Sequence, residues 1–505
     1  MITVVNPTLP YGFAKRHGVV LLDAGEVAVV GLRAGADPLA LVEARRALGR
    51  PLRVERLPQA AFDRELSRAY ADDSVGAAAD DGLDMPSGLD SLIDAMPAAE
   101  DLLDSADDAP VVRLINGVIA EAVRIGASDI HLEPFESALT VRMRVDGVLR
   151  EAHALNPRIA PLLVSRIKVM ARLDIAERRL PQDGRIPLTL GGKSLDVRVS
   201  TLPSRGGERV VLRILDKDQA DLRLDQLGMA PDALEALQSA LREPNGIILA
   251  TGPTGSGKTT SLYAGLALLN DATRNILTVE DPVEYAIDGV GQTQVNAKVG
   301  MTFAAGLRAI LRQDPDVVMV GEIRDVETAA IAVQASLTGH LVLSTVHTND
   351  AVGAVTRLRD MGVEPFLLAS TLRLVVAQRL VRRLCAECRR PEPADSATAR
   401  LAGLQVGQTV WRPHGCAHCN QTGYVGRAGL YEMIRIDDRI RRLIAAETGE
   451  DEIAAAAFAR GGTLGDRARA LVLAGVTSVE EAVRVTRQDV REDGGELHAD
   501  AGAAA

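Results

Sequence analysis

A glycine-rich segment, Gly252-Pro-Thr-Gly-Ser-Gly-Lys-Thr259, constrains the fold of this chain more than any other feature. It follows a short apolar run, Ile247–Ala250, and precedes a stretch of helical character, as a phosphate-binding loop does. Glycines let backbone N–H groups converge on phosphate oxygens, and the following helix directs its positive end there. Lys258 is predicted to contact the β and γ phosphates of ATP, and Thr259 to bind Mg2+. The residues predicted to hold the nucleotide are Gly252, Pro253, Thr254, Gly255, Ser256, Gly257, Lys258, Thr259 and Thr260.

The region after this loop alternates between strand-like and helix-like segments. The apolar runs are 275–279, 316–320 and 341–346, and the helix-like stretches between them are 302–312 and 326–337. Such alternation predicts an α/β fold with a parallel sheet covered by helices on both faces. Ligands of such sheets bind at the carboxyl ends of the strands, so polar residues directly after each run are candidates for the site.

Four acidic residues occupy such positions. Glu322 follows the run 316–320, and Gly321 stands where an Asp is usual, so Glu322 is predicted to hold Mg2+ or polarise the attacking water. Glu280, Asp281 and Glu284 follow the run 275–279 and supply carboxylates at a second strand end. The separate roles of Glu280 and Glu284 are not distinguishable from the sequence.

Two histidines, His340 and His347, flank the run 341–346. Together with Ser344, Thr345 and Asn349 they predict a relay that senses the γ-phosphate.

All four cysteines fall in two Cys-x-x-Cys pairs, Cys385 with Cys388 and Cys416 with Cys419. Four thiolates suit a tetrahedral structural Zn2+ site, and the segment around them is too poor in apolar residues to fold by burial alone. His414 and His418 lie nearby, but four thiolates already complete such a site.

The net charge of −11 belongs to one segment. Residues 71–110 contain twelve acids and no base, and the remainder holds 57 basic against 56 acidic residues, so anionic ligands elsewhere are not excluded. No apolar run is long enough to span a membrane and no secretion signal is evident, which predicts a cytoplasmic protein that attaches to a membrane through partners. The predicted parts are an N-terminal docking module at 1–70, an acidic flexible linker at 71–110, an α+β domain at 111–225, the nucleotide-binding domain at 226–381, the cysteine insert at 382–431, a helical C-terminal subdomain at 432–490 and a disordered tail at 491–505.

The first two folded parts show helix and strand patterns but no catalytic constellation. Strands are expected at 19–22 and 27–32 and a helix at 38–48 in the first part, and a helix at 111–125 begins the second. Strands with regularly placed arginines follow it. Such arginines usually mark a solvated face, although here a phosphate site competes for them.

The motifs together resemble those of the type II/type IV secretion ATPase family. The resemblance rests on the phosphate loop, on Leu277–Tyr285 (the family's aspartate box), on the acidic motif 311–325 with its glycine, on the histidine box 336–349, and on the four cysteines. It covers nearly the whole chain. The stretch Leu9–His17 resembles the part of the type II secretion ATPases that docks on an inner-membrane partner.

The resemblance implies a homo-hexameric ring in which ATP binds between a PAS-like N-terminal domain and a RecA-like domain. It implies that Glu322 is the catalytic glutamate and that Arg198 and Arg213 reach the γ-phosphate. It further implies pseudopilus assembly and export of folded proteins, with the inner-membrane components L and F as partners.

Three alternatives remain. A type IV pilus assembly ATPase shares every catalytic motif, and only the N-terminal module separates the two. A nucleic-acid motor would use a basic patch, but no nucleic-acid-binding module is recognisable, and contact with a neighbouring subunit or anionic lipid is favoured for those residues. A docking protein with an inactive nucleotide site is disfavoured by the intact Lys258 and Glu322. The basic patch that a nucleic-acid motor would use comprises Arg379, Arg382, Arg383, Arg389 and Arg390.

Overall fold

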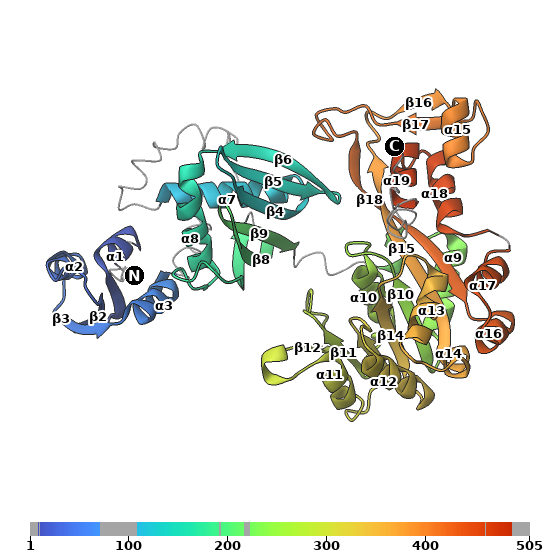
Figure 1. Cartoon of the computed structure of the whole chain (residues 1–505), viewed down its shortest axis with the longest axis horizontal. Coiled ribbons are helices and arrows are strands. Elements are labelled where there is room, and N and C mark those ends of the chain that lie inside the picture. Colours follow the sequence, from blue (N-terminus) through green and yellow to red (C-terminus); the bar gives the residue numbers. More distant parts are fainter. Residues whose placement is uncertain are drawn as a thin grey trace, which may run out of the picture. The chain divides into compact units, whose positions relative to one another are not determined.

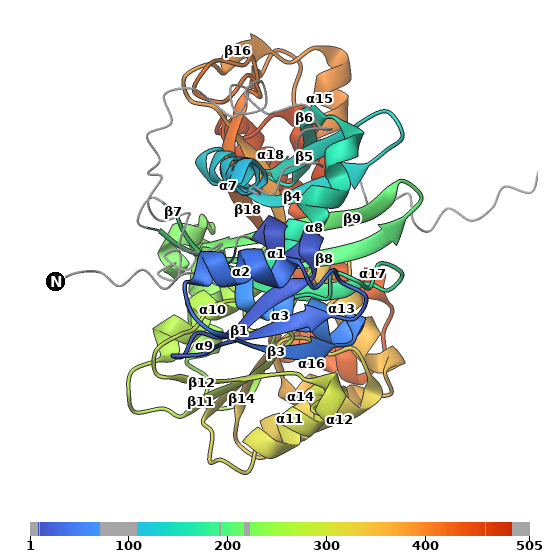
Figure 2. The same ribbon diagram turned by 90° about the vertical axis from the view of Figure 1, so that its left-hand side faces the viewer.

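The computed structural model describes residue 9 and residues 11–70, 109–190, 193–216, 223–459 and 461–486. The chain forms two compact units, Met1–Gln219 and Ala220–Ala505, each of which is described by itself (Figures 1 and 2). The predicted linker up to residue 108 and the predicted tail lie outside the described residues.

The first unit begins with a small module built on a three-stranded sheet. Strands β1 and β2 pair antiparallel, and β2 and β3 pair parallel. The predicted strands and helix are found, whereas β3 and α3 were not predicted, because β3 buries none of its residues and lacks apolar alternation. The elements are α1 (Tyr11–His17), β1 (Val19–Asp23), β2 (Ala28–Arg33), α2 (Ala40–Leu48), β3 (Leu52–Leu57) and α3 (Gln59–Tyr70).

The rest of the first unit is an antiparallel six-stranded sheet of order β6-β5-β4-β9-β8-β7, with α7 and α8 packed on its apolar face. The predicted helix at 111–125 is α7. Phe62 and Leu66 of α3 share a buried cluster with Val169 and Ile175, so the small module packs directly on this part. The elements are α7 (Ala109–Arg124), β4 (Ala127–Pro134), β5 (Leu139–Val145), β6 (Val148–Leu155), α8 (Ala160–Met170), β7 (Gln182–Leu190), β8 (Lys193–Ser204) and β9 (Gly207–Asp216).

The second unit is organised around a seven-stranded sheet of order β12-β11-β13-β14-β10-β15-β18. The strands pair parallel except β18, which runs antiparallel to β15 from Leu374 to Leu384. The α/β prediction is confirmed, and the sheet is mixed rather than purely parallel. Its strands are β10 (Gly246–Thr251), β11 (Ile276–Glu280), β12 (Val290–Gln294), β13 (Val317–Val320), β14 (Leu341–Val346), β15 (Leu372–Leu384) and β18 (Tyr424–Arg435).

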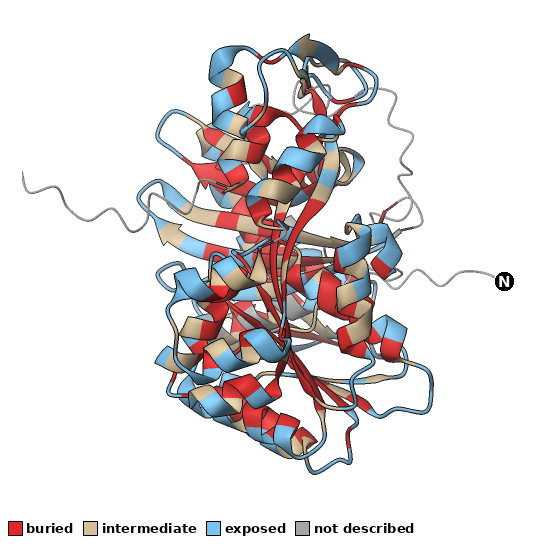
Figure 3. Cartoon of the chain, turned by 90° about the vertical axis from the view of Figure 1, so that its right-hand side faces the viewer, coloured by how far each residue is buried: buried red, intermediate tan, exposed pale blue. Residues whose placement is uncertain are grey.

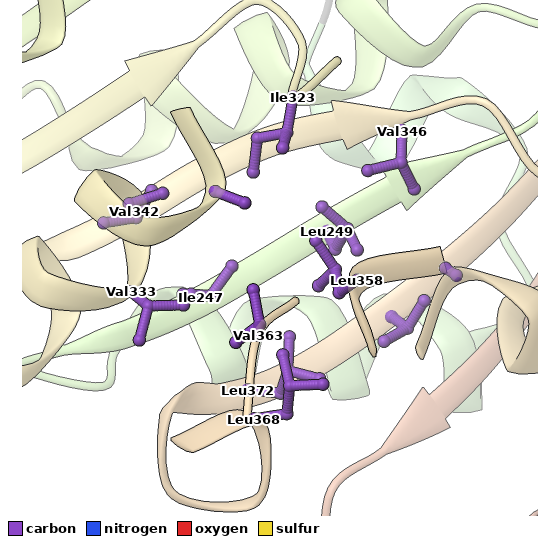
Figure 4. Packing of buried hydrophobic residues seen from close by; sticks show 14 of the residues in the cluster. Ile247, Leu249, Ile323, Val333, Val342, Val346, Leu358, Val363, Leu368 and Leu372 are labelled. Carbon is purple, nitrogen blue, oxygen red and sulfur yellow. The ribbon is translucent and has the colours of Figure 1, made fainter. Parts of the chain in front are cut away.

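Helices cover both faces of this sheet because alternate strand residues point to opposite sides. On β10, Ile247 and Leu249 join one core and Ile248 and Ala250 the other. Figure 3 shows the strands as the most continuously buried part of the unit, and Figure 4 shows the packing of the first core. The first core is covered by α11 (Phe303–Ile310), α12 (Val326–Leu337), α13 (Ala351–Asp360), α14 (Pro365–Thr371), α16 (Asp438–Ala445) and α17 (Glu450–Ala457), and the second by α9 (Pro231–Leu241) and α10 (Lys258–Leu269).

The cysteine segment leaves the sheet at the end of β15 and returns through β18. It contains the small hairpin-like pair β16 (Arg390–Pro393) and β17 (Thr409–Arg412) and the helix α15 (Ser396–Ala402). The last helices that the structure describes are α18 (Leu464–Leu473) and α19 (Val479–Thr486), within the part predicted to be helical at 432–490. Ser478 caps α19, since its hydroxyl accepts the N–H of Glu481 at 3.2 Å. Among the described residues, no helix combines the length and apolar character needed to cross a bilayer.

Candidate nucleotide site and cysteine cluster

The glycine-rich loop joins β10 to α10, as predicted. Gly252 has φ 139°, and a Cβ there would lie 2.4 Å from the carbonyl oxygen of Gln378 on the neighbouring strand β15, so only glycine fits. Pro253, Thr254 and Gly255 are exposed at the tip of the loop. Thr259, in the first turn of α10, is also exposed. The loop therefore presents a helix N-terminus and a hydroxyl to an incoming anion.

Lys258 is buried at the base of the loop, with 8% of its surface exposed. Its ammonium donates to the carbonyl oxygens of Gly252 at 2.6 Å and Pro253 at 3.1 Å. Burial, and then the positive charge of Arg379, lower the pKa of Lys258 to about 8. The negative charge of an anion bound in the loop would offset both effects and favour the charged ammonium.

Glu322 lies directly after β13, where its carboxylate is paired on both sides. His347 Nε2 lies 2.9 Å from Glu322 Oε2, and the Arg324 guanidinium forms an ion pair with Oε1. Burial, and then the charges of Lys258 and Arg324, lower the pKa of His347, which favours the neutral ring. The Glu322 carboxylate is able to orient a water, and the effect of the Lys258 charge on His347 indicates that the pair lies near the phosphate loop.

Steric crowding explains why position 321 is a glycine. A Cβ at this position would lie 3.2 Å from the Phe303 ring and 3.4 Å from the Glu280 Cα, so an aspartate would be crowded. The residues Ser344 and Thr345, predicted to take part in a relay, instead donate to the carbonyl oxygens of Val320 and Gly321 at 2.8 Å each. They fix the segment that carries Glu322.

His340 does not join His347. It lies at the opposite end of β14, where its Nδ1 is 2.9 Å from the Ala335 carbonyl oxygen, and six strand residues separate the two histidines by roughly 20 Å. The predicted relay through both histidines is therefore not formed within one chain. Two residues that flank a strand lie at its opposite ends, and the prediction of the relay did not take this separation into account.

Glu280 and Glu284 differ in their surroundings. Glu280 is 3% exposed and accepts hydrogen bonds from Tyr263, Thr278 and Gln292, whereas Glu284 lies in the following segment and is half-buried. Glu280 is the last residue of β11 and Glu284 follows that strand, which lies next in the sheet to β13.

Arg198 and Arg213 lie in the first unit, directly opposite each other on β8 and β9. Arg185 on β7 is in register with Arg198, and Arg213 donates to Asp129 Oδ1 on β4 at 3.0 Å. The two predicted arginines thus belong to one row of charged side chains that crosses four strands.

Five residues that support the loop were not predicted as part of the site. The hydroxyl of Thr251 contacts that of Thr348 at 2.6 Å and accepts its backbone N–H at 3.0 Å, which ties the ends of β10 and β14 together. Gln378 Oε1 accepts from the Ser261 hydroxyl at 2.8 Å. Arg379, 5% exposed, donates to the Asn349 carbonyl oxygen at 2.9 Å. The only sequence signal for the last two was polarity inside an otherwise apolar run, Val375–Val381.

Burial changes the interpretation of the basic patch that includes Arg379. Arg382 pairs with the buried Glu481 at 2.9 Å, and the guanidinium of Arg389 stacks on Trp411 at 4.5 Å from the ring centre. These three side chains are engaged inside the unit, whereas Arg383 and Arg390 are exposed, so only part of the patch is open to phosphate or lipid contacts.

The four cysteines come together as predicted. Their Sγ atoms all lie within 4.8 Å of one another, with separations of 3.8 Å (385–416), 3.8 Å (388–419) and 3.7 Å (416–419). A tetrahedral ion with sulfur at about 2.3 Å requires sulfur–sulfur edges of about 3.8 Å. Backbone N–H groups donate to sulfur, among them Gly415 to Cys388 at 3.3 Å and Gly423 to Cys419 at 3.1 Å, as thiolates favour. The cluster therefore fits Zn2+.

Comparison with known proteins agrees with these features. The family model described as "Type II/IV secretion system protein" matches residues 104–484, and a model of an N-terminal domain of "GSPII protein E" matches residues 8–70. The chain is 55% identical over 494 residues to Type II secretion system protein E of Klebsiella pneumoniae, covering 96% of this chain and 98% of that one. It is 52% identical over 494 residues to Type II secretion system ATPase E of Vibrio cholerae, covering 95% and 97%.

Solved structures share the fold. The Legionella pneumophila ATPase DotB superposes with a TM-score of 0.56 at 21% identity, covering 74% of this chain and 95% of DotB. The pilus retraction motor PilT with bound ADP gives a TM-score of 0.50 at 26% identity, covering 73% and 95%. The nucleotide-loop sheet, the N-terminal module and the match over almost the full length lead to one conclusion: the chain belongs to the type II/type IV secretion ATPase family, together with the E proteins of type II secretion systems.

Proposed function

We propose that this chain is the ATP-hydrolysing motor of a type II secretion system. The observation that carries the proposal is the pairing of Glu322 with His347 and Arg324 at the strand end beside the Lys258 loop. The match of residues 8–70 to the N-terminal domain of GSPII protein E supports type II secretion over pilus assembly. ATP hydrolysis would drive pseudopilus assembly and the export of folded proteins.

The proposed reaction uses each element of the site in a distinct role. Backbone N–H groups of the loop and Lys258 bind the phosphates, and Glu322 orients the attacking water while His347 holds the carboxylate. Mg2+, held by Thr259, would neutralise phosphate charge. Arg198 and Arg213 would supply positive charge toward the γ-phosphate, and Glu280 and Glu284 belong to the same strand edge as Glu322.

The proposed assembly is a homo-hexamer in the cytoplasm that attaches to the inner membrane through its partners. The N-terminal module would bind the cytoplasmic domain of component L, and the ring would act on the platform component F. No nucleic acid is expected as a partner, because Arg379, Arg382 and Arg389 are engaged within the unit. The cysteine cluster would hold a structural Zn2+ ion.

Glu322→Gln is expected to lower ATP hydrolysis by roughly a hundredfold or more while ATP still binds, because the amide keeps the shape but cannot act on water as a carboxylate does. Phosphate release and binding of a fluorescent ATP analogue measure the two properties. Asp316→Asn is the matched control, since Asp316 lies at the opposite end of β13, where it accepts the Asn275 N–H at 2.7 Å. Near-normal turnover in Glu322→Gln would remove this glutamate from the mechanism.

The cellular role is tested by partner choice, with the full-length protein and purified cytoplasmic domains. Component L is expected to bind, and the gene is expected to restore secretion in a strain that lacks its own type II ATPase. Binding only to a pilus platform protein, with pilus extension restored instead, would keep the enzyme and transfer the function to pilus assembly.

A further inference from the structure

A closed hydrogen-bond network links the helix of the phosphate loop to the acidic segment after β11. Its centre is the Glu280 carboxylate, which is 3% exposed. Thr278 donates to Oε1 at 2.5 Å, Gln292 donates to Oε1 at 3.1 Å, and the Tyr263 hydroxyl donates to Oε2. Because both oxygens already accept hydrogen bonds inside the protein, this carboxylate is committed to holding its neighbours.

Tyr263 connects this carboxylate to two other segments. It lies on α10, five residues after Lys258, and is 2% exposed. Its hydroxyl oxygen accepts the backbone N–H of Glu284 at 3.3 Å, and its ring meets that of Tyr285 edge-on with centroids 4.7 Å apart. A single hydroxyl thus contacts β11 and the segment 281–285 from the helix that begins at the phosphate loop.

Gln292 on β12 closes the network from the other side. Its Oε1 accepts the N–H of Ile287 at 2.8 Å, and its Nε2 donates to the Tyr285 carbonyl oxygen at 3.1 Å. Burial, and then the hydrogen bond to Glu280, raise the pKa of Tyr263, so its hydroxyl keeps the proton that it donates. Every polar partner at this junction has a defined direction.

We propose that Tyr263 is a positioning residue for ATP hydrolysis that acts through Glu280. This role rests on the proposed ATPase function. It is to hold the segment with Glu284 in a fixed position relative to the helix that carries Lys258 and Thr259. Glu280 is then a positioning residue as well and takes no part in proton transfer. This separates it from Glu322, whose carboxylate pairs with a half-exposed histidine and arginine.

The test compares Tyr263→Phe with Tyr285→Phe in the full-length protein. Within the described part of the chain, no hydrogen bond of the Tyr285 hydroxyl is found, so the second variant is a matched control and is expected to behave as wild type. Tyr263→Phe is expected to lower kcat roughly tenfold with little change in KM for ATP, because a buried hydrogen bond to a charged group is lost and the segment shifts.

Glu280→Gln and Glu280→Ala separate positioning from chemistry. The oxygen of the introduced amide still accepts from Tyr263, and its nitrogen is able to donate to Thr278, but that nitrogen faces the Gln292 amide nitrogen and loses this one contact. Glu280→Gln is therefore expected to lower kcat by no more than about tenfold and to leave the pH profile unchanged. Glu280→Ala is expected to lose at least as much as Tyr263→Phe, and combining the two should cost little more than Glu280→Ala alone. A loss in Glu280→Gln equal to that of Glu322→Gln would overturn the proposal.

Amide hydrogen exchange supplies a readout that does not need activity. Residues 281–292 are expected to exchange faster in Tyr263→Phe than in Tyr285→Phe, with melting temperatures above the assay temperature in both. If the wild-type protein did not hydrolyse ATP, that result would refute the proposed function and not the positioning role. Equal exchange in the two variants, or equal kcat in an active enzyme, would refute the positioning role.

Discussion

Lys258→Ala is expected to reduce ATP hydrolysis by at least roughly a thousandfold and to weaken nucleotide binding. The buried ammonium is the positive side chain at the base of the loop, and charge stabilisation of this kind supplies most of the acceleration in phosphoryl transfer. The fold should persist, because the lost contacts are two loop carbonyl oxygens, Gly252 and Pro253, that face the nucleotide site. Phosphate release, binding of a fluorescent ADP analogue and thermal melting measure the three effects.

Lys298→Ala is the matched control for this prediction. Lys298 is exposed in a short turn beyond β12, in the same unit as Lys258. Removing its charge should leave both turnover and melting unchanged. If Lys258→Ala hydrolysed ATP at the control's rate, the glycine-rich loop would not be the nucleotide site.

Local motifs carried most of the information about this site. The phosphate loop and Glu322 were predictable because each follows a buried strand, and parallel strands place their carboxyl ends along one edge. The supporting contacts were not predictable in this way, because they join residues far apart in sequence. Thr251 and Thr348 are 97 positions apart, and Ser261 and Gln378 are 117 apart.

Strands β15 and β18 show where the apolar periodicity of the sequence gives a wrong indication of where a strand ends. Strand β15 continues to Leu384, past the predicted domain end at 381, and pairs with β18 on the far side of the cysteines. The apolar pattern weakens where Gln378, Arg379 and Arg382 enter the strand, although each of the three has a hydrogen-bond partner. These polar residues lie inside the strand and contact residues far away in the sequence. From the sequence alone they suggest that the strand ends there.

Tyr263 shows the same limit on the helix. In sequence it is one apolar-looking position in a stretch that packs on the sheet, and its side chain does belong to that core. Its hydroxyl is the part that matters to the site, and its partners come from β11 and the segment after it. Only the folded arrangement brings these together.

Cys385→Ala is expected to release the metal and to unfold the insert. Structural zinc contributes roughly 10–16 kcal/mol to the folding of small metal-dependent modules, whereas the residues between β15 and β18 add to the neighbouring apolar core three buried side chains, Ala394, Ala399 and Val410, and the partly buried Ala402 and Leu404. Elemental analysis should show one zinc per chain in the wild type and little in the variant, and melting should gain an early transition. ATP hydrolysis should fall as well, because β15 and β18 carry the insert and also complete the central sheet.

His414→Ala and His418→Ala distinguish a four-thiolate site from one that uses imidazole. Both rings are accessible near the cluster and have other partners: His414 lies 2.8 Å from Arg390, and His418 lies 3.5 Å from Glu387. Sulfur separations of 3.7–3.8 Å already satisfy a tetrahedral ion, so both histidine variants should keep their zinc. Loss of zinc from either would make that histidine a ligand, and unchanged zinc and melting in Cys385→Ala would show that the insert folds without this thiolate.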